Sequence, residues 1–173
     1  MDSLTRASAA LVLASAAAAS HAGELSVQRE TTIDRAPATV WKMVGDFNAL
    51  DVWHPAVTRS TATGNAPGAT RLLTLGNGAT ISEKLLARDA AKHSYSYAIL
   101  KSPLPVKNYK STLQLSPTPD GKTLMRWSST FEAAGADEAD QRIAVEGVVV
   151  GDQDAHARSL AAPVRGGRDA FRT

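Results

Sequence analysis

Apolar and polar residues alternate along most of the chain from Arg71 to Glu132, which is the pattern of half-buried β-strands. The alternation stops at segments rich in glycine, proline, asparagine and aspartate, the residues that favour turns. Two shorter alternating runs precede this region. The pattern predicts strands at 25–33, 57–63, 69–75, 79–89, 93–100, 108–116 and 122–132.

Helical spacing replaces the alternation in two parts of the chain. Pro37 suits the first turn of a helix, and the apolar residues of 40–47 then recur at helical spacing. After a short break, a second short helix is expected at 49–53. A third helical pattern, over 137–163, predicts a long C-terminal helix, and its glycines and valines mean that packing must stabilise it.

The register of one predicted hairpin follows from its apolar residues. A three-residue loop at 76–78 places Leu73 opposite Ile81, and it places Arg71 opposite Glu83. A shift by one residue would turn a whole strand face over. The apolar match therefore favours the three-residue loop and makes Arg71 and Glu83 cross-strand neighbours.

The strand face that should point inward carries many polar and aromatic groups. An arginine and a glutamate are not expected on a face that serves only to close a core, because buried charges need partners. They are expected on a sheet that lines a ligand cavity. The polar and aromatic residues on this face are Arg71, Glu83, Tyr95, Tyr97, Tyr109 and Trp127, and they share it with Leu73, Ile81, Leu85, Ile99 and Leu113.

The two ends of the chain differ from this central part. Residues 1–22 resemble a cleavable export signal, with a small and apolar run at 7–19 and small residues before the expected cleavage site after Ala22. The apolar run is too short to span a bilayer, so no stable membrane insertion is expected. We therefore expect a periplasmic protein with one ligand-binding domain at 23–163 and a loose basic tail at 164–173.

Composition excludes several kinds of chemistry. The chain has no cysteine, so disulfides and thiol catalysis are excluded, and its net charge of +2 without a dense basic stripe makes nucleic acid an unexpected partner. Beyond residue 22 the histidines are His54, His93 and His156, which are too widely spaced to predict a zinc site. No phosphate-binding or dinucleotide-binding loop is present, so we expect neither a metal nor a cofactor.

The order of elements, a strand, two short helices, about six strands and a long helix, predicts an α+β domain. With its local motifs this order resembles the polyketide cyclase/dehydrase and lipid-transport (SRPBCC) superfamily, which has the START or Bet v 1-like helix-grip fold. The resemblance covers about residues 24–160. The motifs that carry it are Ala36-Pro37-Ala38-Thr39-Val40-Trp41, Asp46-Phe47, Trp53-His54-Pro55-Ala56-Val57, Gly68-Ala69-Thr70-Arg71, Asn77-Gly78, Glu83, Tyr95-Ser96-Tyr97 and Trp127-Ser128-Ser129.

The resemblance implies a curved antiparallel sheet that grips the C-terminal helix, with an apolar cavity between them. Trp53 and His54 lie where the family has its cavity entrance, and the loop from Lys101 to Lys107 is a candidate entrance loop for anionic groups. Each of these residues also has a purely structural interpretation, as a core or loop residue. The candidate ligand-binding residues are Arg71, Glu83, Tyr95, Tyr97, Tyr109, Trp127, Trp53 and His54.

Three functions remain open from the sequence. The first is binding of a small hydrophobic ligand, such as a lipid, a polyketide-like or an aromatic molecule, without a covalent step. The second is an enzyme of the cyclase or dehydratase kind in which Glu83 or His54 moves protons. The third is an accessory protein of a periplasmic dehydrogenase, because exported bacterial proteins similar to this one include a group that accompanies periplasmic methanol oxidation.

Overall fold

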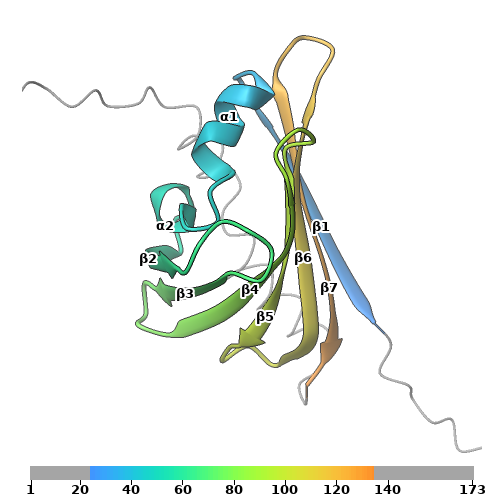
Figure 1. The fold of residues 1–173 in the computed structure, drawn as a ribbon. Helices are drawn as coiled ribbons and strands as arrows, with labels where there is room; N and C mark the ends of the chain where they lie inside the picture. The colour runs from blue at the N-terminus through green and yellow to red at the C-terminus, as the bar shows by residue number, and fades with distance from the viewer. Residues whose placement is uncertain (1–23, 135–173) are drawn as a thin grey trace, which may run out of the picture.

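The computed structural model describes residues 24–134. Seven strands form one antiparallel sheet in the order β1-β7-β6-β5-β4-β3-β2. The sheet curves, and two short helices lie on its concave side (Figure 1). The elements are β1 (Leu25–Ile33), α1 (Pro37–Val44), α2 (Leu50–Trp53), β2 (Val57–Ala62), β3 (Thr70–Leu75), β4 (Thr80–Asp89), β5 (Ser94–Lys101), β6 (Val106–Pro117) and β7 (Thr123–Ala133).

The helices follow the sequence signals that predicted them. Pro37 occupies the first turn of α1, and Val40, Trp41 and Val44 form its buried side. The helix ends at Gly45, where an added Cβ would lie only 2.5 Å from the Trp41 ring, so a residue without a side chain is required there. After a short break, α2 buries Leu50 and Trp53. Both helices therefore cover the concave face with aromatic and aliphatic side chains.

The register of the β3–β4 hairpin is as predicted. Arg71 pairs with Glu83 and Leu73 pairs with Ile81. The Leu75 N–H donates to the carbonyl oxygen of Ala79 at 2.9 Å, which closes a three-residue loop. Gly78 takes a φ of +82° in this loop, a value that glycine adopts without strain. The glycine in the turn and the pairing of apolar residues thus favour the same register between β3 and β4.

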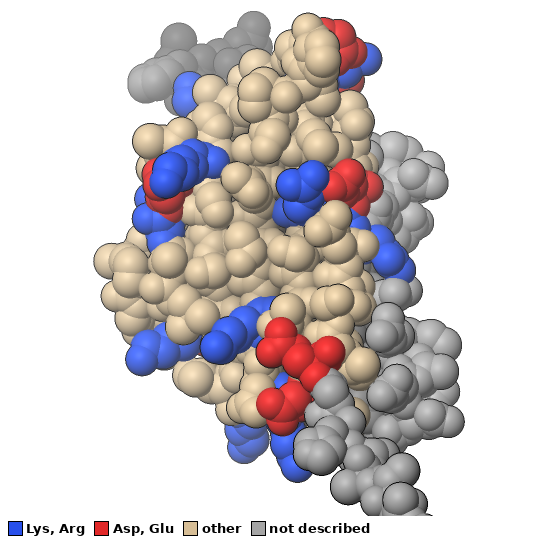
Figure 2. Space-filling view, turned by 90° about the vertical axis from the view of Figure 1, so that its right-hand side faces the viewer, with Lys and Arg blue, Asp and Glu red and all other residues tan. Residues whose placement is uncertain are grey.

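Alternate residues of the strands point to the buried concave face. On this face β5 to β7 contribute aromatic and aliphatic side chains together with Ser111 and Ser129, which are also buried. The opposite face is mixed, with exposed leucines such as Leu72 and Leu86. On the side of the molecule seen in Figure 2, basic and acidic residues lie next to each other in several small groups, and they form no continuous basic stripe.

Two predicted boundaries differ from the structure at the β5–β6 connection. β5 continues to Lys101, and β6 begins at Val106, two residues before the predicted start. The reason is an irregularity in the β6–β7 pairing between Lys107 and Lys110, which lets β6 extend past a bulge that the alternation does not reveal.

Several predictions fall on residues that lie outside the described part of the chain. These are the export signal at 1–22, the helix at 137–163 and the tail at 164–173. Among residues 24–134, no helix combines the length and the apolar character that a membrane crossing requires.

Candidate functional site

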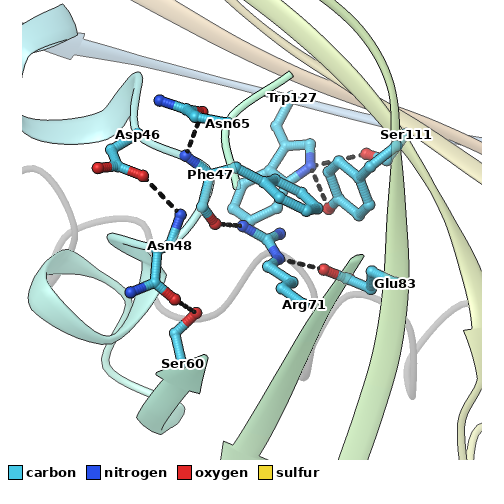
Figure 3. A network of polar contacts seen from close by, with 10 residues as sticks. Asp46, Phe47, Asn48, Ser60, Asn65, Arg71, Glu83, Ser111 and Trp127 are labelled. Atoms are coloured by element: carbon cyan, nitrogen blue, oxygen red, sulfur yellow. Dashed lines mark hydrogen bonds and ion pairs between the residues drawn. The ribbon is translucent and has the colours of Figure 1, made fainter. Parts of the chain in front are cut away.

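A buried ion pair joins β3 and β4 on the concave face. Arg71 Nε donates to Glu83 Oε2 at 2.5 Å, and Arg71 Nη1 donates to the carbonyl oxygen of Phe47 at 2.6 Å (Figure 3). Both charged residues are buried, with 2% of Arg71 and 4% of Glu83 exposed. The pairing follows from the hairpin register, and it gives each charge the partner that burial demands.

The rest of the Arg71 guanidinium lies among aromatic rings. Its central carbon is 4.2 Å from the centre of the Phe47 ring and 5.1 Å from that of Tyr97, within the range of cation–π attraction. Arg71 Nη2 is buried and makes no hydrogen bond with the residues of the described chain. A buried donor without an acceptor costs free energy, so this nitrogen can gain from an acceptor brought by another molecule.

Glu83 also lines a small cavity on the concave face. The volume of this cavity is about 10 Å³, close to the minimum for one water molecule. Its polar lining includes His54 and Tyr97 as well as Glu83, so the two predicted acid/base candidates meet at one place. Within residues 24–134 its lining consists of Leu50, His54, Val57, Leu73, Leu75, Ile81, Glu83, Tyr97 and Trp127.

Burial changes the acid–base properties of this carboxyl group. Removal from water raises the pKa of Glu83 above the usual value of a glutamate, and the charge and hydrogen bond of Arg71 oppose that rise. Burial likewise raises the pKa of the Tyr97 and Tyr109 hydroxyl groups, which keeps both in the protonated form. A buried carboxyl group of raised pKa that lines a cavity is a candidate for holding or transferring a proton.

His54 is held in a fixed orientation at the end of α2. The Ala56 N–H donates to His54 Nδ1 at 3.2 Å, so a neutral His54 ring carries its proton on Nε2. The ring centre lies 5.9 Å from that of Trp53 and 5.7 Å from that of Trp127. Only 2% of the residue is exposed, so His54 forms part of the inner wall.

Trp127 connects this wall to hydroxyl groups on β5 and β6. Its Nε1 donates to Ser111 Oγ at 2.7 Å and to Tyr97 Oη at 3.1 Å (Figure 3). Ser111 in turn donates to the carbonyl oxygen of Ser128 at 3.0 Å. The indole of Trp127 therefore has a fixed orientation, with its ring facing His54 and the small cavity.

Two further hydroxyl groups extend this chain of hydrogen bonds. Ser129 Oγ lies 3.0 Å from Ser111 Oγ, and Tyr109 Oη lies 2.7 Å from Ser129 Oγ. Because Ser111 uses its single proton on a carbonyl oxygen, Ser129 must donate to Ser111, and Tyr109 must then donate to Ser129. Each of these hydroxyl groups therefore donates its proton to the next oxygen in the chain, which ends at the carbonyl oxygen of Ser128. These hydrogen bonds make the wall rigid.

The structure places five of the eight predicted residues at the cavity beside Glu83 and the other three around it. Glu83, His54, Tyr97 and Trp127 line one cavity, and Arg71 reaches it through Glu83. Trp53 lies behind this cavity, with its ring centre 5.8 Å from that of Trp127. The remaining two candidates flank this group: the Tyr95 ring centre lies 6.1 Å from that of Tyr97, and the Tyr109 ring centre lies 6.5 Å from it on the other side.

Ser111, Ser129 and Phe47 complete the site but were not among the predicted residues. Ser111 and Ser129 lie two positions from Tyr109 and Trp127, so the period-two pattern contained a signal for their place on the inner face, but small polar residues did not stand out as candidates. Phe47 contributes its ring and its carbonyl oxygen to Arg71, a contact between residues 24 positions apart. Strand alternation contains no signal for such a contact, because Phe47 lies between the helices.

Side-chain hydrogen bonds fasten the segment between α1 and α2 to the rest of the domain. The Phe47 N–H donates to Asn65 Oδ1 at 3.0 Å, and Ser60 Oγ donates to Asn48 Oδ1 at 3.2 Å (Figure 3). With the bond from Arg71, these contacts hold the Phe47 ring over the ion pair. The ring thereby covers the Arg71 guanidinium.

The cavity at this site is smaller than the apolar cavity that the resemblance implies. Among residues 24–134 the aromatic side chains pack against one another and leave about 10 Å³ beside Glu83. The polar residues were expected to line an open space, whereas most of them hydrogen-bond to one another. The expected space against the C-terminal helix concerns residues outside the described range. Within that range, no group of histidine, aspartate and glutamate side chains could hold a metal ion.

Comparisons with known proteins agree with this architecture. Residues 24–165 match the family described as polyketide cyclase/dehydrase and lipid transport. An MLP-like protein of Arabidopsis thaliana, MLP-like protein 423, is 37% identical over 75 residues, which cover 40% of this chain and 48% of that protein. The chain thus spans about half the length of this curated relative.

Two bacterial structures share the fold over most of this chain. An uncharacterised protein from Bacillus thuringiensis is 27% identical with a TM-score of 0.73, covering 80% of this chain and 100% of its own. The protein XoxI from Bacillus cereus is 28% identical with a TM-score of 0.72, covering 78% of this chain and 94% of its own. Together with the family match over most of the sequence, these similarities show that the chain belongs to the polyketide cyclase/dehydrase and lipid transport family.

Proposed function

We propose that this protein binds a small apolar molecule with one hydrogen-bonding end group against the concave face of its sheet. The observation that carries the proposal is Arg71, a buried cation whose Nη2 has no hydrogen-bond partner within the described chain. The family description, which includes lipid transport, supports the same kind of ligand. The end group would accept a hydrogen bond from Arg71 or meet the cavity beside Glu83.

The energetics favour an apolar ligand with few polar atoms. Each Å² of apolar surface removed from water contributes about 25 cal/mol, and the aromatic wall of Trp127, Tyr97 and Phe47 offers such surface. The hydroxyl groups of Ser111, Ser129 and Tyr109 behind this wall are already bonded to one another, so they favour no additional polar group. The orientation of the bound ligand then depends on the few polar atoms of Arg71, Glu83 and His54.

A molecule larger than water must displace a side chain to occupy this site. The present cavity of about 10 Å³ is closed partly by Leu50, and the Phe47 ring lies over Arg71. Both residues belong to the segment of α1 and α2, which side-chain hydrogen bonds attach to β2, to the β2–β3 loop and, through Arg71 and Arg88, to β3 and β4. In our proposal this segment moves outward when the ligand binds.

The cellular location that we propose is the periplasm. It rests on residues 1–22, whose charged start, small apolar run and Ser20-His21-Ala22 ending are typical of a cleaved export signal. In this proposal the family's helix-grip arrangement also extends to the C-terminal residues 137–163. The protein would then carry its ligand outside the inner membrane.

A second candidate function is acid–base catalysis on the bound molecule. The observation that favours it is the meeting of Glu83 and His54 at one cavity, together with the raised pKa of the Glu83 carboxyl. In such a reaction the protonated Glu83 would donate a proton, and His54 Nδ1 would take one up in exchange for the hydrogen bond that it accepts from the Ala56 N–H. This function requires that the ligand leaves chemically changed.

Native mass spectrometry tests the first proposal. The full chain, purified from its own source without detergent, should carry a bound small molecule that denaturation releases. The extracted molecule should rebind unchanged to ligand-free protein. The first proposal fails if the source-purified protein carries nothing and the extract of its source contains nothing that binds. Chemical conversion by the wild type but not by Glu83→Gln would establish the enzyme instead.

A further inference from the structure

A second and larger hollow lies at the opposite end of β5 from the His93 turn. Its volume is about 710 Å³, within the range of small-molecule sites. The residues that line it belong to two consecutive segments, 98–102 and 106–110. It shares no lining residue with the small cavity beside Glu83. We refer to it as the β5–β6 pocket.

The β5–β6 pocket exists because two paired strands separate. Backbone pairing between β5 and β6 ends at Ala98 and Lys110, although β5 runs on to Lys101 and β6 starts at Val106. Asn108 has a φ of +52°, a left-handed conformation that is uncommon outside glycine. The bulge at this point directs the start of β6 toward β7 and leaves the side toward β5 open.

Positive charge surrounds this opening. Lys101, Lys107 and Lys110 all line the pocket, and none of them forms an ion pair with the described residues. Among the described residues that line the pocket, none is an aspartate or a glutamate. The nearest acidic side chain along β7, Glu132, accepts a hydrogen bond from Asn108 Nδ2 at 2.9 Å instead. Lysines gathered around a concave surface attract anions.

The remaining lining is largely apolar. Ile99, Leu100 and Val106 contribute aliphatic side chains, and Leu100 is 56% exposed. Lysine side chains can also lay their aliphatic stems along an apolar surface while the charged group stays in water. The pocket therefore combines aliphatic side chains with three lysines. This combination matches a molecule with an apolar chain and one anionic end.

Tyr109 separates the β5–β6 pocket from the inner site. It lines the pocket, yet only 2% of it is exposed, and its ring centre lies 6.5 Å from that of Tyr97. Its hydroxyl group is bonded to Ser129. The β5–β6 pocket is consequently separate from the cavity beside Glu83, and the Tyr109 ring forms the boundary between them.

We infer that the β5–β6 pocket is a binding site for an amphipathic monoanion, with its carboxylate among Lys101, Lys107 and Lys110 and its alkyl or aryl part on Ile99, Leu100 and Val106. This site goes beyond the proposed function, because it requires neither Arg71 nor the cavity beside Glu83. The β5–β6 pocket should prefer a ligand with a negative charge, whereas the site beside Glu83 should prefer a ligand with a large apolar surface.

Isothermal titration of the full chain with octanoate and with 1-octanol at low salt tests this inference. The two probes have the same chain length and differ in charge. Wild-type protein should bind octanoate about tenfold more tightly than 1-octanol, the scale expected for a few exposed ion pairs. Added salt should reduce this preference. Equal affinity of the two probes, or no binding of octanoate, would overturn the inference.

Two double variants test whether the preference for octanoate arises in the β5–β6 pocket. Lys101→Gln/Lys110→Gln should reduce the preference for octanoate to about twofold or less, since most of the local charge is lost. Lys42→Gln/Lys92→Gln removes the same charge from exposed residues that do not line the pocket and should retain the preference. Backbone amide shifts caused by octanoate should centre on 98–101 and 107–110. An equal loss in both variants, or shifts centred on His54 and Glu83, would overturn the proposed site.

Discussion

Arg71 and Glu83 lie opposite each other on β3 and β4, and their side chains form a buried ion pair with an Nε to Oε2 distance of 2.5 Å. The same guanidinium bonds to the carbonyl oxygen of Phe47, which lies between α1 and α2. One arginine thus connects the hairpin, the helical segment and the cavity beside Glu83. The shape of the candidate site depends on this residue.

Removing Arg71 should destabilise the fold strongly. Arg71→Met would leave the Glu83 carboxylate buried without a partner, and the expected loss is about 3–5 kcal/mol of unfolding free energy at neutral pH. Urea denaturation followed by circular dichroism measures this loss. The control is Arg126→Met, which breaks the pair with Glu30 at 2.6 Å, where both side chains are well exposed. That change should cost about 1 kcal/mol or less.

The double variant Arg71→Met/Glu83→Leu separates charge burial from packing. It removes both charges, so a large part of the loss caused by Arg71→Met should be recovered. A loss for Arg71→Met no larger than that for Arg126→Met would contradict the buried pair as described.

The stability contributed by Glu83 should fall as the pH rises. Burial raises the pKa of its carboxyl group in the folded state, so the folded protein holds this proton more tightly than the unfolded chain. The contribution is complete below the pKa of an unfolded glutamate, about 4.3, and is lost as the pH rises through the higher folded value. The unfolding free energy of the wild type minus that of Glu83→Gln should therefore decrease from about pH 4 upward. A difference that increases with pH would refute the raised pKa.

Loss of the Ser111 hydroxyl group should destabilise the hydroxyl chain. Ser111→Ala removes an acceptor of the Trp127 indole and the partner of Ser129, and the expected cost is about 1–3 kcal/mol. Ser128→Ala, on the half-buried outer side of β7, should cost about 0.5 kcal/mol or less. Thermal unfolding of both variants, monitored by circular dichroism, makes the comparison. Equal effects would show that the inner hydrogen bonds contribute nothing specific.

Gly45 should not tolerate a side chain. A Cβ at this position would lie 2.5 Å from the Trp41 ring and 2.7 Å from the Trp41 carbonyl oxygen, so Gly45→Ala forces the indole to move at a cost of about 1–3 kcal/mol. Gly76→Ala is the control, because nothing lies within 4 Å of an added Cβ there. Urea denaturation should show a clear loss for the first variant and little change for the second. A stable Gly45→Ala protein would mean that Trp41 packs differently.

Local sequence patterns predicted most of the described fold. The alternation placed Arg71, Glu83, Tyr97 and Trp127 on one face, because side chains of a strand alternate strictly between two faces. The hairpin register followed from a match of apolar residues around a glycine that adopts a positive φ. These features depend on a few neighbouring residues, so a single sequence contains the information.

The details of the site depend on contacts between distant segments. The alternation of apolar and polar residues does not reveal that Phe47 lies next to Arg71. It also does not show that aromatic rings fill most of the space beside Glu83. The opening between β5 and β6 arises from a bulge near Asn108, where one irregular backbone conformation ends the pairing. The sequence did suggest an entrance loop at 101–107, but it could not show a pocket lined by Lys110.

Intermolecular nuclear Overhauser effects between 1-octanol and the full chain test the central claim most directly, since they show which face of the sheet holds an apolar molecule. The proposed function predicts contacts from the alkyl protons to the rings of Trp127, Tyr97 and Phe47, together with changed amide shifts at Glu83. Contacts confined to Leu72 and Leu86, the exposed leucines of the opposite face, would contradict it.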